Sequence, residues 1–230
     1  MDSRPQTGVP DNDQTPGTLQ LTLAITNRRL RLMAQISRIF LGSAPLAEMA
    51  TELTHNICEA FDVDASAIRV LEGDELVLLA ETGIPNSRAV PRMSTSDGIA
   101  AQLVRDHRPI MIENVATHPS TAHLHKAALQ ENRYVFLSYA GAPMMIGNQV
   151  VGVLGIFSRS ETRKFEESDL DYLQIVANHV AVAITGHRLY EELDQDHQRL
   201  KDNISRRERA ENQLYFNTMH DLLTGLPNRR

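Results

Sequence analysis

Apolar residues recur every three or four positions in two segments near the start of the chain. The first stripe consists of Leu32, Met33, Ile36, Ile39 and Phe40, and the second of Leu46, Met49, Leu53, Ile57 and Phe61. This spacing places apolar side chains on one face of an α-helix. Gly42 and Pro45 lie between the stripes and are residues at which helices end. The pattern predicts a helix that ends before Gly42 and a second helix over residues 45–61.

Short apolar runs in the middle of the chain predict β-strands. Residues 65–72 and 76–81 form two such runs, and Glu72-Gly73-Asp74-Glu75 between them is a hairpin signal. A helix is predicted over residues 97–107, because capping residues precede it and Pro109 follows it. A brief strand over residues 109–113 comes next.

A stronger hairpin follows a polar stretch over residues 114–133, in which a short helix is predicted around residues 123–130. Its strands are predicted over residues 134–146 and 150–158, with Gly147-Asn148 as the turn. Residues 150–157 are apolar or glycine at every position. Such a run is typical of a strand covered on both faces.

From Phe165 onward the pattern is helical and has two apolar surfaces. One surface consists of Leu170, Leu173, Ala177, Val180 and Ile184, and the other of Tyr172, Ile175, Val176, Val182 and Ala183. A helix that packs only on its own sheet needs one apolar face. The second surface therefore predicts a further partner, most economically a second copy of the chain.

After Ile184 the apolar positions follow a heptad repeat. The a positions are Tyr190, His197, Ile204 and Glu211, and the d positions are Leu193, Leu200, Arg207 and Leu214. Leucine at three of four d positions favours a parallel two-stranded coiled coil. The polar residues in the seam weaken the pairing, so its register is expected to shift at low cost. A solvated helix with scattered leucines is the alternative.

Composition and charge narrow the class of protein. The chain has 230 residues, is 42% hydrophobic and carries a formal net charge of −6, which disfavours nucleic acid and anionic membrane as partners. A single cysteine, Cys58, excludes an internal disulfide framework. No apolar stretch is long enough for a transmembrane helix, and the N-terminus lacks the pattern of a signal peptide. We expect a cytoplasmic protein.

The order of the predicted elements over residues 30–187 resembles the GAF domain, a dimerising sensor module that binds small molecules. The matching residues are Pro143, the segment 147–158 (Gly-Asn-Gln-Val-Val-Gly-Val-Leu-Gly-Ile-Phe-Ser) and the segment 165–170 (Phe-Glu-Glu-Ser-Asp-Leu). Gly152 and Gly155 allow close approach on a buried strand. The resemblance implies an α+β fold: a GAF-like antiparallel sheet flanked by helices, with a long C-terminal coiled-coil helix.

The last residues, 220–230 (His-Asp-Leu-Leu-Thr-Gly-Leu-Pro-Asn-Arg-Arg), are similar to the opening of GGDEF domains, whose active members condense two GTP into cyclic di-GMP. The residues of this opening turn are Asp221, Thr224, Gly225, Pro227, Asn228 and Arg229. The catalytic residues of that family lie beyond Arg230, so this chain holds none. The resemblance implies that the intact protein is a diguanylate cyclase.

Four segments follow from these patterns. Residues 1–18 are a disordered tail, 19–187 a GAF-like sensor domain with an N-terminal helix, 188–217 a coiled-coil signalling helix, and 218–230 the truncated start of a GGDEF domain. The hypothesis is a parallel homodimer that transmits small-molecule binding to the GGDEF output. The alternatives are a structural dimerisation module without a ligand and a regulator of a GGDEF-EAL phosphodiesterase.

The resemblance also implies a pocket with the strand over residues 134–145 as its floor and residues 114–133 as its lid. The candidate ligand-binding residues are His118, His123, His125, Arg133 and Tyr134. Their histidines are consistent with plain loop residues, with hydrogen bonding of a small polar or anionic ligand, or with haem or a metal ion. The spacing of His123 and His125 fits no common zinc pattern, so no metal site is predicted.

Cys58 is the remaining candidate for chemistry. It lies within the second predicted helix and lacks the histidine that usually follows a chromophore-bearing cysteine, so a partly buried structural thiol is favoured over a bilin attachment site. The signature of cyclic-nucleotide-binding GAF domains is absent. No nucleophile–base arrangement or phosphate-binding loop is found. The cofactor, if any, stays unknown.

Overall fold

The computed structural model describes residues 16–39, 44–84, 90–96, 98–122, 126, 136–160 and 164–219. The chain divides into two compact units, residues 1–183 and residues 184–230. Most of the predicted tail and the whole GGDEF-like opening turn lie outside the described residues. Residues 16–18, predicted to be disordered, belong to the first helix.

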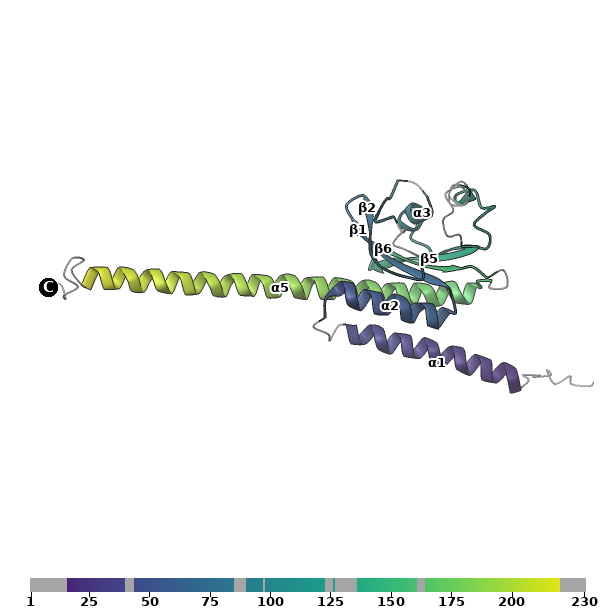
Figure 1. The fold of residues 1–230 in the computed structure, drawn as a ribbon, viewed down its shortest axis with the longest axis horizontal. Helices are drawn as coiled ribbons and strands as arrows, with labels where there is room; N and C mark the ends of the chain where they lie inside the picture. The colour runs from purple at the N-terminus through teal and green to yellow at the C-terminus, as the bar shows by residue number, and fades with distance from the viewer. Residues whose placement is uncertain are drawn as a thin grey trace, which may run out of the picture. The chain divides into compact units, whose positions relative to one another are not determined.

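The first unit is built on an antiparallel sheet of six strands in the order β3-β2-β1-β6-β5-β4 (Figure 1). The strands are β1 (Ala65–Glu72), β2 (Glu75–Thr82), β3 (Arg92–Ser94), β4 (Ile110–Ile112), β5 (Ser138–Ile146) and β6 (Gln149–Ser158). Both predicted hairpins are present, and β1 pairs with β6 to join them. The predicted fold class, α+β with an antiparallel sheet flanked by helices, is confirmed.

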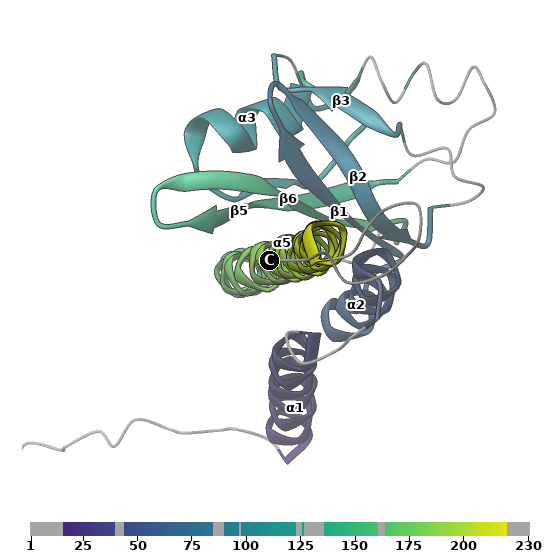
Figure 2. The same ribbon diagram turned by 90° about the vertical axis from the view of Figure 1, so that its left-hand side faces the viewer.

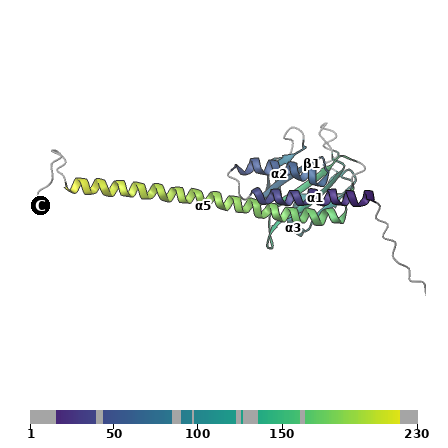
Figure 3. The same cartoon turned by 90° about the horizontal axis from the view of Figure 1, so that it is seen from below.

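Helices cover both faces of this sheet (Figure 2). On one side lie α2 (Leu46–Phe61) and residues 167–183 of α5 (Glu167–Met219), with α1 (Pro16–Ile39) as an outer layer (Figure 3). On the other side lies α3 (Gly98–Asp106). The first core lies between the sheet and α2 and α5; its fully buried side chains include Leu53, Ile57, Ile68, Leu154, Ile156 and Leu173. Helices on both faces of the sheet agree with the apolar run in β6, which predicted a strand covered on both sides.

Gly152 shows why this central strand carries glycine. A Cβ atom at Gly152 would overlap the carbonyl oxygen of Arg69 on β1 and the side chain of Met144 on β5. No other residue fits between those neighbours without displacing them. The close approach predicted for this position is confirmed.

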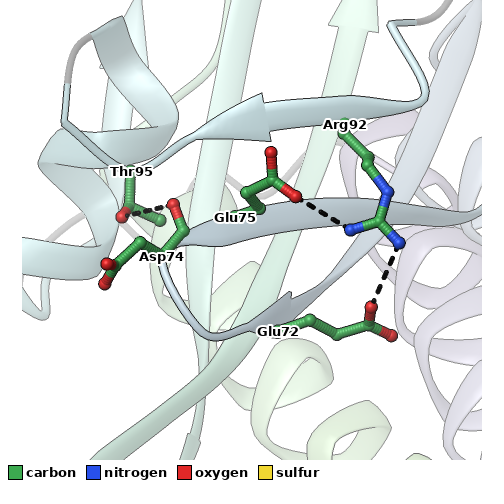
Figure 4. A network of polar contacts seen from close by, with 5 residues as sticks. All are labelled: Glu72, Asp74, Glu75, Arg92 and Thr95. Carbon is green, nitrogen blue, oxygen red and sulfur yellow. Dashed lines mark hydrogen bonds and ion pairs between the residues drawn. The ribbon is translucent and has the colours of Figure 1, made fainter.

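The short edge strand β3 was not predicted. Its Arg92 forms ion pairs with Glu75 (Nη1 to Oε2, 2.8 Å) and Glu72 (Nη2 to Oε2, 3.6 Å), as Figure 4 shows. The Thr95 hydroxyl donates a hydrogen bond to the Asp74 carbonyl oxygen at 2.9 Å. These contacts and the antiparallel pairing with β2 hold β3 against the β1–β2 hairpin. Neither produces a periodic apolar pattern in the sequence.

The second apolar surface of α5 is covered in part by the chain's own helices. The Tyr172 ring packs against Phe61 of α2 with centroids 5.1 Å apart, and its hydroxyl donates to the Arg29 carbonyl oxygen of α1 at 2.8 Å. Ile175 and Val182 of the same surface are each 50% exposed. Contacts with α1 and α2 thus account for part of the surface that had been assigned to a second copy.

The described part of the second unit, residues 184–219, is the C-terminal portion of α5. The predicted seam residues Tyr190, Leu193, His197, Leu200, Ile204, Arg207 and Leu214 are all exposed. Arg207, at a d position, pairs with Glu211, at the next a position, with Nε 2.9 Å from Oε1. The helix is present as expected, and its pairing with a second copy stays a prediction. No described helix has the length and apolar character that a membrane span requires.

Candidate ligand-binding site

Side chains of β1 alternate between the two faces of the sheet. The Ser66 hydroxyl donates to the Thr54 carbonyl oxygen of α2 at 2.8 Å, so Ser66 and Ile68 face the helical layer. Leu71 packs in the cluster that contains Leu103 of α3. Arg69 is two residues from Leu71, so its side chain lies on the same face of the sheet, the α3 face. This face is the candidate site.

The strand register brings residues of four strands to this face. Arg69 is opposite Val153, and Tyr139 is opposite Phe157. An irregularity in the β1–β2 pairing next to Ile68 places Glu81 opposite Ala67. Because directly opposed residues share a face, Glu81 and Arg69 lie on the same side of the sheet as Tyr139.

Much of the α3 face is filled by the chain's own apolar side chains. The second core cluster consists of Leu76, Ala100, Leu103, Ile112, Tyr139 and Val153, with Phe157 and other partly buried residues packed around it. Leu103 is fully buried and anchors α3 over the sheet. This cluster holds α3 in place and removes the neighbouring polar groups from water.

Tyr139 is the polar residue at the centre of this cluster. Its side chain is 9% exposed, and its ring lies 5.0 Å from that of Phe157. A Cβ atom at Gly141 would overlap the Tyr139 hydroxyl and Leu103, so the glycine makes room for both. Burial raises the pKa of Tyr139, and the nearby Arg69 charge opposes that shift. The phenol keeps its proton at neutral pH and remains a hydrogen-bond donor.

Arg69 and Glu81 are charged groups with buried atoms that lack partners. Nη1 of Arg69 and Oε2 of Glu81 are shielded from solvent, and neither has a hydrogen-bond partner among the described residues. Burial lowers the pKa of Arg69, opposed by Tyr139 and Glu81. Burial likewise raises the pKa of Glu81, opposed by Arg69. Unpartnered buried polar atoms are rare in proteins, and a bound molecule is one way in which their hydrogen bonding is completed.

His118 is the only described member of the residues predicted to bind ligand. It lies in the turn after β4, where its Nδ1 accepts a hydrogen bond from the Ser120 backbone N–H at 3.3 Å. His123, His125, Arg133 and Tyr134 lie outside the described residues, so their role stays a prediction. Within the described ranges, no three His, Cys, Asp or Glu side chains are grouped to hold a metal ion.

Arg69, Glu81 and Tyr139 were missed as site residues by the sequence reasoning. One signal was available: Arg69 lies in β1 between two buried apolar residues, Ile68 and Val70. A charged residue there is costly unless it faces a polar group or a ligand. Strand alternation alone does not show that Glu81 shares its face, because the irregularity in β2 changes the alternation.

Cys58 lies away from this site. It is buried on α2, where burial raises the pKa of the thiol and a hydrogen bond with Ser66 opposes the shift. Ser66 belongs to the helical face of the sheet. The thiol is therefore protonated at neutral pH and faces the first core.

This antiparallel sheet, with α2 and α5 on one face and α3 over the other, defines a small α+β domain. The model of the GAF domain matches residues 43–185, which is more than half of the chain. The chain belongs to the GAF domain family.

Several solved structures share the fold. The GAF domain of a phosphoenolpyruvate-protein phosphotransferase from Coxiella burnetii has a TM-score of 0.60 and 24% identity, over 72% of this chain and 97% of that chain. The A. aeolicus nlh2 GAF domain in an inactive state has a TM-score of 0.58 and 19% identity, over 70% and 98%. The free methionine-R-sulfoxide reductase of Neisseria meningitidis, solved with its substrate, has a TM-score of 0.58 and 20% identity, over 70% and 91%. At these identities the likeness concerns the fold.

Proposed function

We propose that this chain is the sensory part of a cyclic di-GMP signalling protein. A small molecule binds on the α3 face of the sheet, and α5 passes the change to a GGDEF output domain that begins at residues 220–230. The observation that carries this proposal is a hydrogen-bonded link between β5 and α5. Tyr139 and Gly141 of β5 lie on the α3 face. Further along the same strand, the backbone of β5 forms hydrogen bonds with α5.

The link lies at an irregularity in the pairing of β5 with β6. The register of β5 on β6 shifts between Met144 and Met145. Gln174 of α5 donates from Nε2 to the Pro143 carbonyl oxygen at 2.8 Å, and the Met145 N–H donates to Oδ1 of Asn178 at 3.3 Å. Nε2 of Gln174 also contacts Oδ1 of Asn178 at 2.8 Å, which ties the two links together.

This arrangement supports transmission along a single helix. A shift of β5 on ligand binding changes the positions of the Pro143 carbonyl and the Met145 N–H. Gln174 and Asn178 then move α5, which continues as one helix to Met219. A change in helix position or register is a common way to gate a distant domain.

The proposed output needs two chains. In the coiled coil inferred from the heptad pattern, the paired helices bring two GGDEF domains face to face, each holding one GTP. The exposed seam side chains support this proposal, with Leu193 at 69%, Leu200 at 61% and Leu214 at 66% exposure. Apolar side chains at this spacing gain stability when a second helix covers them.

A comparison of cyclase rates tests the proposal. The full-length protein, extended past Arg230, is assayed for conversion of GTP to cyclic di-GMP with panels of amino acids, 2-oxo acids and nucleotides. We expect one panel to change the rate, and deletion of residues 30–187 to abolish that change. A response that survives the deletion contradicts the proposal.

A second candidate function, dimerisation without a ligand, is favoured by the apolar cluster on the α3 face. There Leu103, Ile112 and Val153 already occupy much of the face. An unchanged melting temperature across all three panels would support it. A phosphodiesterase output is the remaining alternative. The sequence after Arg230 distinguishes it from a cyclase, because a phosphodiesterase of this kind would have an EAL domain after the GGDEF domain.

A further inference from the structure

We propose that the α3 face recognises a small zwitterion of the amino-acid type. Arg69 and Tyr139 bind its carboxylate, and Glu81 binds its ammonium group. This inference rests on the proposed function, since it names the ligand class of the same site.

The first step is the presence of two opposite charges that do not pair. Nη1 of Arg69 and Oε2 of Glu81 are both buried and unpartnered among the described residues. Arg69 and Glu81 influence each other electrostatically, yet no ion pair within 4.0 Å joins them. Both residues are partly exposed as a whole, but each holds one atom of its charged group away from water. Direct contact between the two side chains would offset the desolvation of these atoms, and the structure does not show that contact.

The second step is the arrangement of donors and acceptor. Arg69 offers the planar N–H fork that matches a carboxylate. Tyr139 lies within electrostatic range of Arg69 and retains its hydroxyl proton, so it adds a neutral donor. Glu81 offers only acceptors when ionised. A ligand that offers an anionic acceptor to Arg69 and Tyr139 and a cationic donor to Glu81 satisfies all three.

The third step is the apolar surroundings. Val153 and Leu76 of the cluster on the α3 face are 4% and 0% exposed. In such surroundings charge-assisted hydrogen bonds are stronger than in water, and an unpaired charge is more costly. The site therefore discriminates against molecules that carry only one of the two charges.

Arg69→Met provides the sharpest variant. Methionine keeps much of the length of the side chain and removes the guanidinium group, whose Nη1 is buried without a partner. If Arg69 serves ligand binding, the variant without ligand should melt at the same or a higher temperature than the wild type, while binding is lost. If Arg69 serves only the fold, the variant should melt at a lower temperature.

The binding test uses the full-length protein and the proteinogenic amino acids, each added singly. Calorimetry and thermal shift are recorded for the wild type, Arg69→Met, Glu81→Gln and the control Arg92→Gln, whose arginine is exposed at β3. Each amino acid that binds is compared with its 2-oxo acid and its decarboxylated amine. We expect at least one amino acid to bind, and its two counterparts to bind roughly tenfold or more weakly, as the loss of one charge-assisted bond requires.

Arg69→Met and Glu81→Gln should weaken binding at least as much, and Arg92→Gln should match the wild type. The inference is overturned if no amino acid binds. It is also overturned if the 2-oxo acid binds as tightly as the amino acid and Glu81→Gln keeps the full affinity of the wild type. Binding that leaves cyclic di-GMP production unchanged supports the ligand class and contradicts the proposed function alone. A cyclase response to nucleotides only supports the proposed function and overturns the zwitterion.

Discussion

Two glycines, Gly141 and Gly155, make room for the Tyr139 side chain on the α3 face. A Cβ atom at Gly155 would lie 3.0 Å from Cε2 of Tyr139, and one at Gly141 would overlap its hydroxyl. Gly141→Ala should destabilise the protein by about 1–3 kcal/mol, because the ring and Leu103 must both move. Urea unfolding measures this change. A loss below about 0.5 kcal/mol, the usual range of a surface substitution, would contradict the close contact.

Tyr172 provides a pH test of the packing of α1. Burial raises the pKa of Tyr172 to about 12, and the Arg29 charge opposes the shift. The folded pKa is higher than the unfolded value of about 10, so the neutral phenol stabilises the fold fully below pH 10. This contribution is lost as the pH rises from about 10 towards 12.

Absorbance titration of tyrosinate measures the same shift. At least two of the five tyrosines, Tyr139 and Tyr172, should ionise later than a free phenol. Tyr172→Phe should remove one of the late steps. Ionisation of all tyrosines together near pH 10 would contradict the burial of both rings.

At the scale of elements, α1 is attached by a few buried contacts. Leu32 is 1% exposed, whereas Leu30 on the same helix is 61% exposed. Leu32→Ala should lower the free energy of unfolding by about 2–4 kcal/mol, and Leu30→Ala by less than about 0.5 kcal/mol. Equal effects of the two substitutions in chemical denaturation would show that α1 does not pack as described.

The elements could be predicted from the sequence where a periodic pattern was long enough. α2, both long hairpins and α5 follow from apolar spacing, and the residues that turn the chain, such as Gly73 and Gly147, both have positive φ. β3 could not be predicted, because three residues carry no period and the strand is held by pairing with β2 and by ion pairs with distant glutamates. The site could be predicted from the sequence only in part. Arg69 can be recognised as a charged residue in a buried strand, but the placement of Glu81 depends on an irregularity in the pairing of β1 with β2.

At the scale of the whole molecule, the heptad prediction concerns assembly. Leu200→Glu puts a charge at a predicted d position, and Gln195→Glu puts one at a predicted f position, away from the seam. Sedimentation should show a dimer for the full-length wild type and for Gln195→Glu, and a shift to monomer for Leu200→Glu. A dimer of unchanged affinity in Leu200→Glu would place the interface elsewhere.

The central claim is that a molecule bound on the α3 face controls output through the contacts between β5 and α5. Its most direct test compares the cyclic di-GMP synthesis rate of the full-length wild type and Gln174→Ala, with and without a bound amino acid. Gln174 lies on α5, on the side of the sheet opposite to α3, and donates a hydrogen bond to the Pro143 carbonyl oxygen at 2.8 Å. The account predicts that the amino acid changes the wild-type rate, and that Gln174→Ala binds it with the same affinity but loses most of the change. A rate response of full size in Gln174→Ala would contradict the account.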